Sequence, residues 1–186
     1  VGFQEGVQAV RKGVEYVKEI DLAMTELKKV TDETDASYKQ FLKDAGSTSA
    51  IIGSTISDFT EASATFARLG YSMEESSKMA ESAILYKNVA DGLDTVEESS
   101  ESIISTMMAF GIEANDTMSI IDRFNAVGNA FAITSAGIGD ALQRSASALY
   151  SAGNTIDESV ALVTAANSVI QNPEQVGKTL ADYKVA

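Results

Sequence analysis

The 186-residue sequence contains no cysteine, histidine or tryptophan, and it has a single proline. Without cysteine the chain can form no disulfide and offers no thiolate for catalysis. Without histidine a serine–histidine–aspartate triad is impossible, and no motif supports a serine–lysine pair in its place. The scarcity of proline removes the main obstacle to long helices. The composition therefore favours a helical chain that lacks the usual groups of a hydrolase.

Long hydrophobic runs are also absent. The longest stretch without a charge covers residues 124–139, and several asparagine, serine and threonine residues interrupt it. Crossing a bilayer takes about 20 consecutive apolar residues, so no membrane span is expected in this segment. The hydrophobic fraction of 45% is ordinary for a folded chain, and the length suits one or two domains. Because the sequence begins with Val1, we expect it to be a segment of a longer protein.

Basic residues are scarce, and the net charge is −13. Such a surface repels phosphate, so direct nucleic-acid binding by this segment is not expected. The imbalance is uneven along the chain. Residues 1–46 hold seven Lys and Arg against nine Asp and Glu, while residues 47–186 carry the rest of the negative charge. The first quarter therefore has the mixed charges of an exposed helix, and the remainder is acidic.

A glycine followed by a helix-capping pattern recurs along the sequence. In residues 69–76 (LGYSMEES) and 153–159 (GNTIDES), a glycine can end one helix, and a hydroxyl residue with a glutamate three positions later can open the next as a capping box. Residues 111–117 (GIEANDT) are a degraded copy, with Glu113 at the cap position and Asn115 as the substitute cap. The glycines are 41 and 42 residues apart, a period typical of helical repeats.

A long amphipathic helix is predicted for residues 3–30. Its apolar side chains recur at intervals of three, four or seven residues and form a narrow stripe. The stripe consists of Val7, Val10, Val14, Val17, Met24 and Leu27. It suits a partner helix, from the same chain or from another subunit, and the sequence leaves both alternatives open. Residues 31–34 are predicted to break this helix, residues 35–45 to form a short one, and residues 46–50 to form a loop.

Further helices are predicted through the rest of the chain, starting at Thr55, Ser72, Thr95, about Asp116, Thr134 or Ser135, Thr155 and Asn172. Methionine and phenylalanine are expected to anchor a modest core, since many helix faces use alanine and serine. The residues predicted to point inward include Phe59, Phe66, Met73, Met79, Tyr86, Ile103, Met107, Met108, Met118, Ile121, Phe124, Ile138, Leu142 and Leu149. No stretch alternates in the manner of a strand.

The predicted fold class is therefore all-α, with antiparallel helical hairpins or repeats that form a bundle or a short solenoid after a long N-terminal helix. Two parts are expected. Residues 1–46 form an arm of one long and one short helix, available for a coiled coil or for oligomerisation. Residues 47–186 form a helical-repeat domain.

Five short segments follow one another along the chain: residues 21–31 (DLAMTELKKVT), 67–75 (ARLGYSMEE), 90–98 (ADGLDTVEE), 108–112 (MAFGI) and 140–144 (DALQR). Together they resemble the conserved region of phage tail tape measure proteins, in the branch found in tailed phages and prophages of Gram-positive bacteria. Each segment alone is a weak signal, but their order and spacing are fairly specific, and the resemblance covers roughly residues 20–170. Two features depart from the family pattern: Glu113 at a cap position, and Gly137 with Gly139 near a helix start.

The resemblance implies a structural role in setting tail length and nucleating the tail tube. It implies tail-tube proteins, tail-tip proteins and tail assembly chaperones as partners, and homo-oligomers through helix packing. The implied location is the tail lumen of the virion, with assembly in the host cytoplasm. An alternative is a helical-repeat protein-binding module of bacterial or prophage origin, since repeat folds commonly bind partners.

Adjacent acids are the first candidates for chemistry, as acid/base pairs or metal ligands. The pairs are Glu74 and Glu75, Glu97 and Glu98, and Asp157 and Glu158. Each pair follows a predicted cap, where acids stabilise a helix N-terminus, and no other catalytic group accompanies it. Residues 91–94 lack the alternating oxygen ligands of a calcium loop, and the methionines are interpreted as core rather than as a binding groove. We therefore predict no catalytic, cofactor-binding or metal-binding residue and no enzymatic activity.

Overall fold

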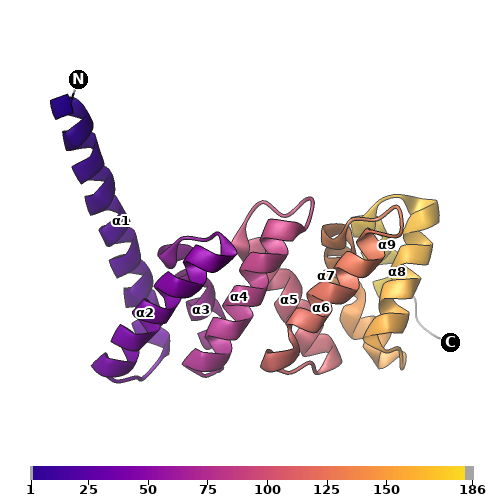
Figure 1. The fold of residues 1–186 in the computed structure, drawn as a ribbon. Helices are drawn as coiled ribbons and strands as arrows, with labels where there is room; N and C mark the ends of the chain where they lie inside the picture. The colour runs from indigo at the N-terminus through magenta and orange to yellow at the C-terminus, as the bar shows by residue number, and fades with distance from the viewer. Residues whose placement is uncertain (1, 183–186) are drawn as a thin grey trace. The chain divides into compact units, whose positions relative to one another are not determined.

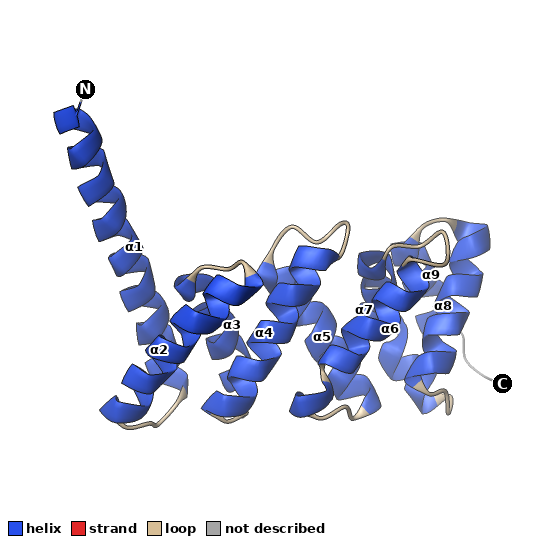
Figure 2. Ribbon diagram, in the orientation of Figure 1, coloured by secondary structure: helices blue, strands red, loops and turns tan. Residues whose placement is uncertain are grey.

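A computed structural model describes residues 2–182, with side chains from residue 4 onward. Val1 and residues 183–186, the last of the predicted repeat domain, lie outside the described residues. The described part folds into nine α-helices and one short 3-10 turn, and it contains no strand (Figures 1 and 2). The predicted all-α class and the long N-terminal helix are confirmed.

In chain order the elements are α1 (Gly2–Val30), α2 (Asp35–Ile52), α3 (Ile56–Ala67), α4 (Met73–Val89), α5 (Val96–Phe110), η1 (Ala114–Asp116), α6 (Met118–Gly128), α7 (Ser135–Ser151), α8 (Ile156–Ile170) and α9 (Pro173–Asp182). Among the described helices, none is both long and apolar enough to cross a membrane.

The helices group into two compact units, Val1–Glu81 and Ser82–Ala186, with the boundary inside α4. In the first unit α3 packs against both α1 and α2. In the second unit α7 is central and contacts α5, α6, α8 and α9. The expected division into an arm of residues 1–46 and a repeat domain stays a prediction.

The predicted capping boxes are present at α4 and α8. The amide of Glu75 donates to the Ser72 hydroxyl at 3.2 Å, and the Glu75 carboxylate accepts from the Ser72 amide at 2.9 Å. Thr155 and Glu158 make the same reciprocal pair, with bonds of 3.2 and 2.8 Å. Each box satisfies amides that the first turn of a helix leaves unpaired.

Glycines in the left-handed region close the turns before these caps. The φ angles are +94° at Gly70, +66° at Gly111 and +91° at Gly153. A side chain at such a φ is strained, which explains why glycine recurs at these three places. The recurring glycines of the sequence therefore mark helix ends in the structure.

The loop predicted at residues 46–50 is wrong, because α2 continues through it to Ile52. The helix ends at Gly53, which has φ +71°. Serine, threonine and glycine suggest a loop by composition, but Ala45, Ser49 and Ile52 are spaced three and four apart and are buried. Burial of this face outweighs the weak local preference for a turn.

Asn115 is not the cap of the degraded copy. It lies inside η1, whose N-cap Glu113 makes no side-chain cap bond. Thr117 precedes α6 and also makes no cap bond with its side chain. Its hydroxyl instead donates to the Ser82 hydroxyl at 3.2 Å. The same hydroxyl lies 3.0 Å from the backbone oxygen of Ala114. This helix start therefore lacks a side-chain cap, and a contact between distant segments helps to hold it.

Methionine and phenylalanine do anchor the core, with Met79, Met107, Phe66 and Phe124 almost fully buried. Two methionines predicted to point inward do not. Met108 is 64% exposed and Met118 is 38% exposed. Met108 follows the buried Met107, and consecutive helical residues lie about 100° apart, so both cannot face the same core.

Glycine allows three helices of the second unit to approach closely. Helix α7 begins after the cap Thr134 and continues through Gly139, so this glycine does not disturb the helix start. A Cβ atom at position 139 would lie 2.7 Å from the Tyr86 hydroxyl and would also overlap Ser102 of α5. A Cβ atom at Gly177 of α9 would lie 2.6 Å from the backbone oxygen of Ala141 in α7. These two glycines are therefore packing residues.

The close contact predicts a cost for a methyl group in α9. Gly177→Ala should destabilise the second unit by about 1–3 kcal/mol, because the obstructing atoms belong to the backbone of α7 and cannot rotate away. Gly13→Ala is the matched control, since nothing lies within 4 Å of its Cβ position. It should leave stability unchanged or raise it by up to about 1 kcal/mol. Urea denaturation followed by circular dichroism measures both, and equal effects of the two substitutions would contradict the packing role of Gly177.

Candidate functional site

The first half of α1 presents an uncovered apolar stripe. Val7, Val10, Val14 and Val17 are 39%, 67%, 49% and 64% exposed. Their spacing of three, four and three residues keeps them on one side of the helix, as in the seam of a coiled coil. We call these four valines the α1 stripe. No described element covers it, so it is a candidate contact surface.

The second half of the same helix behaves differently. Ala23, Met24 and Leu27 are buried, and α1 packs there against α3. At this contact between α1 and α3, the guanidinium of Arg68, the C-cap residue of α3, lies 3.2 Å from the Glu26 carboxylate. Of the two alternatives left open by the sequence, packing within the chain applies to Met24 and Leu27, while the α1 stripe remains open to another subunit.

The paired acids are used at helix starts. In the box at α5, the Glu98 carboxylate accepts from the amides of Asp94 and Thr95 at 3.0 and 3.1 Å. The Glu98 amide donates to the Thr95 hydroxyl at 3.1 Å. These backbone hydrogen bonds lower the pKa of Glu98, because they stabilise its charged form. The pKa values of Glu75 and Glu158 are lowered by their own capping bonds in the same way.

Other acids next to the caps bind basic side chains. Glu74 lies 2.9 Å from the Lys78 ammonium, one helical turn away. Asp157 lies 2.8 Å from Nε of Arg123, which joins the start of α8 to α6. These pairs are exposed, so each contributes modestly to stability. Within the described residues no three acids converge as metal ligands.

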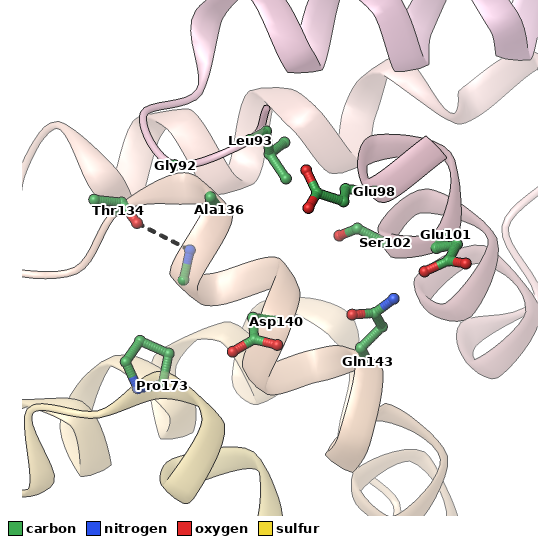
Figure 3. A pocket seen from close by; sticks show the side chains of 11 residues that line it. Gly92, Leu93, Glu98, Glu101, Ser102, Thr134, Ala136, Asp140, Gln143 and Pro173 are labelled. Atoms are coloured by element: carbon green, nitrogen blue, oxygen red, sulfur yellow. Dashed lines mark hydrogen bonds between the residues drawn. The ribbon is translucent and has the colours of Figure 1, made fainter. Parts of the chain in front are cut away.

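A cavity of about 340 Å³ lies in the second unit, between the loop before α5, the facing sides of α5 and α7, and the start of α9 (Figure 3). Its lining includes Leu93, Glu98, Glu101, Ser102, Asp140, Gln143 and Pro173. Figure 3 shows the α5 acids opposite Asp140 and Gln143 of α7. The lining carries three acidic side chains beside apolar ones, and its Ser102 hydroxyl is hydrogen-bonded to no base among the described residues.

Two of the carboxylates around this cavity already have partners. Glu98 belongs to the capping box of α5, and Asp140 forms an ion pair with Arg144. Arg144 also lies 3.6 Å from Glu174 of α9, which holds α7 and α9 together. The arrangement therefore serves the contacts between helices.

Two buried hydroxyls lie near the cavity, and one of them connects α4 to α7. The Tyr86 hydroxyl donates to the backbone oxygen of Ser135 at 2.8 Å. Burial raises the pKa of Tyr86, and the nearby Ser102 opposes this to a smaller degree. Ser102 Oγ itself has no hydrogen-bond partner of good geometry among the described residues. The sequence predicted an inward Tyr86 but gave no signal for the carbonyl that its hydroxyl binds.

A second recess, of about 490 Å³, lies in the first unit between α2 and the first turns of α4. Its floor includes Phe41 and Phe59, whose ring centroids are 6.1 Å apart, and its rim includes Gln40, Asp44 and Glu81. An apolar floor with a polar rim is the usual composition of a small binding groove.

Comparison with known proteins gives one family. The family model described as "Phage-related minor tail protein" matches residues 39–182, which include most of α2 and every later helix. No solved structure matches the chain.

The capping box at α5 predicts a pH-dependent contribution to stability. Because the pKa of Glu98 is lower in the folded chain than in the unfolded one, its contribution is present above the unfolded value and is lost as the pH falls through the folded value. Glu98→Gln should therefore lower Tm at pH 7, and the difference from the native chain should disappear below about pH 3.

Thr95→Ala is the matched comparison, because it removes a partner that does not titrate. It should cost about 1 kcal/mol at pH 7 and should keep most of this effect in acid. Thermal unfolding from about pH 2 to about pH 7 tests both substitutions. A loss in Glu98→Gln that is independent of pH would show that the carboxylate charge contributes nothing.

Proposed function

The chain belongs to the family of phage-related minor tail proteins, and from this membership we propose that it is a segment of a phage tail tape measure protein. The family makes it a structural component of the virion tail. In the proposed role the parent protein lies in the tail lumen, helps to set tail length and nucleates assembly of the tail tube. Its partners are then tail-tube and tail-tip proteins and, in the host cytoplasm, tail assembly chaperones.

The family match over residues 39–182 carries the proposal. It is supported by the order of the short segments that resemble tape measure proteins of Gram-positive phages and prophages. The all-α fold of the described residues is also consistent with the role, because a helix extended along the tail would convert residue number into length at about 1.5 Å per residue.

The α1 stripe supports self-association as part of this role. Four exposed valines at coiled-coil spacing bury little area within the chain, and pairing them across copies would remove them from water. The proposed segment therefore assembles with its own copies through α1, while the rest of the chain folds into packed helices.

The recess of about 490 Å³ in the first unit favours a second candidate, a protein-binding module of bacterial or prophage origin. Its apolar floor could receive a side chain of a partner protein. The two candidates differ in one measurable respect: only a ruler makes tail length depend on the number of its residues.

Tail length in particles tests the ruler. Three tandem extra copies of residues 113–153 in the parent protein should lengthen the tail by up to about 180 Å, since about 40 helical residues span about 60 Å. Electron microscopy of purified particles gives the length distribution.

The matched control replaces residues 113–153 by residues 72–111, which keeps the chain within one residue of its original length. Its tails should have the original length. Intact tails of unchanged length in the duplication variant would contradict the ruler and favour the binding module.

The proposed self-association gives a further prediction. Val10→Glu with Val14→Glu should weaken association of the purified chain by about tenfold or more, because it places charge in an apolar seam. Sedimentation equilibrium measures this loss, and the far-ultraviolet circular dichroism should not change.

Ile51→Glu is the control, since Ile51 is 84% exposed on α2 and lies outside the seam. It should associate like the native chain. A native chain that stays monomeric, or an association that survives the double substitution, would rule out the α1 stripe as the interface.

A further inference from the structure

Helix α8 has a second apolar side that no described element covers. Leu162 is 41% exposed, Val169 is 83% exposed, and Ala165 between them is exposed. The opposite side of the helix holds the buried Val160 and Val163. Residues 159–172 contain no charge. A helix that is apolar on both sides is typical of one buried on both sides.

The residues of α4 at the corresponding distances from its N-cap are buried. Counted from the caps Thr155 and Ser72, the outer residues of α8 stand seven, ten and fourteen positions on, and α4 has Met79, Ser82 and Tyr86 there. These three are 0%, 6% and 0% exposed. The outer side of α8 thus repeats a buried side of α4.

Known contacts show what covers this side of α4 within the second unit. The Thr117 hydroxyl at the start of α6 donates to Ser82, and the Phe124 ring of α6 lies 6.0 Å from the Tyr86 ring. The Tyr86 hydroxyl reaches the first residue of α7. The next pair of helices, α6 and α7, therefore provides the cover.

Helix α6 in turn contacts α8, the first helix of the following pair. Ile120 stands seven positions after Glu113, which is the N-cap of the η1 turn that precedes α6, and it is fully buried. Arg123 stands ten positions after it and forms the ion pair with Asp157 of α8. In both cases the helix that makes the contact belongs to the next pair along the chain.

The second helix of each pair follows a matching rule. Gly139 and Gly177 stand five positions after the caps Thr134 and Asn172. They rest on Ser102 and Ala141, which stand seven positions after the caps of the preceding second helices.

Ser102 and Ala141 are buried by this contact. The equivalent residue of α9 is Thr179, which is exposed. Both helices of the last pair thus present a side that is covered in the earlier pairs.

We propose that the outer side of α8 (Leu162, Ala165 and Val169) and Thr179 of α9 form a docking surface for a further helical hairpin of the same kind. The hairpin would carry an apolar first helix and a glycine five positions after the cap of its second helix, as α7 and α9 do. A neutral face of small and branched side chains suits such a helix, since it offers no charge to pair and permits close approach. The surface specifies a partner whatever the tail function proves to be.

A tandem variant tests the surface. A copy of residues 152–186 is appended after Ala186 of the full chain, so that a second α8–α9 pair can cover the first. The linker of about eight residues before the new helix is within the usual range for helix pairs. Amide hydrogen exchange in the first α8 should slow by about tenfold or more relative to the original chain, because its outer side is now covered.

The same substitution placed in either copy provides the control. Val169→Glu in the first copy should abolish the added protection, since it places a carboxylate in the new contact. Val169→Glu in the appended copy should leave that protection intact, because the appended α8 keeps an open outer side. Unchanged exchange in the tandem chain, or equal effects of the two placements, would overturn the proposal. Neither result depends on tail length, so failure here is distinct from failure of the ruler.

Discussion

The backbone of α9 rests on the backbone of α7 at Gly177 and Ala141, and the packing of the second unit depends on this contact. At such a place the distance between helices is set by backbone atoms rather than by a layer of side chains. The helices can then come close enough for Ile138, Leu142 and Val176 to be fully buried. Tolerance for size is low there, because neither backbone can yield without moving a whole helix.

Close packing also explains how many small polar residues occur in the core. Buried hydroxyls bind carbonyls of their own helix, as Ser63 does to Phe59, Thr106 to Ser102 and Ser145 to Ala141, at 2.8–3.0 Å. A hydroxyl satisfied four residues back needs no partner on the next helix. Serine and threonine can therefore act as small packing residues, and they do not fix which helix lies opposite. That choice is left to the few large side chains, such as Tyr86 and Phe124.

The small polar residues and the few large side chains thus have different roles in packing, and this difference determines what could be predicted from the sequence. Helix ends depend on local chemistry, so Gly70 with Ser72 and Gly153 with Thr155 were sufficient to place them. Contacts between helices left no comparable signal. Gly46 and Gly139 are the same residue type in helical surroundings, and only tertiary packing distinguishes them: an added Cβ would meet one side chain at an ordinary 3.5 Å at the first and would overlap two buried hydroxyls at the second.

The candidate surfaces were predictable to different degrees for the same reason. The α1 stripe was visible because period and charge identify an amphipathic helix. The outer side of α8 was not, because a helix with apolar residues on two sides does not show which side faces the core until its neighbours are known. Comparison of cap-relative positions supplies that direction, since Val169 and Tyr86 occupy the same place in their helices and only Tyr86 is covered.

Charge gives these surfaces their selectivity. A chain with a net charge of −13 repels its own copies, which opposes association through its acidic faces. Repulsion is weakest where the acids are nearly balanced by bases, and residues 1–46, which contain the α1 stripe, have seven bases against nine acids. The outer side of α8 avoids repulsion differently, since residues 159–172 carry no charge at all. An apolar contact in either place would gain burial at little electrostatic cost, which is why the two proposed contacts lie on these helices and not on the acidic faces.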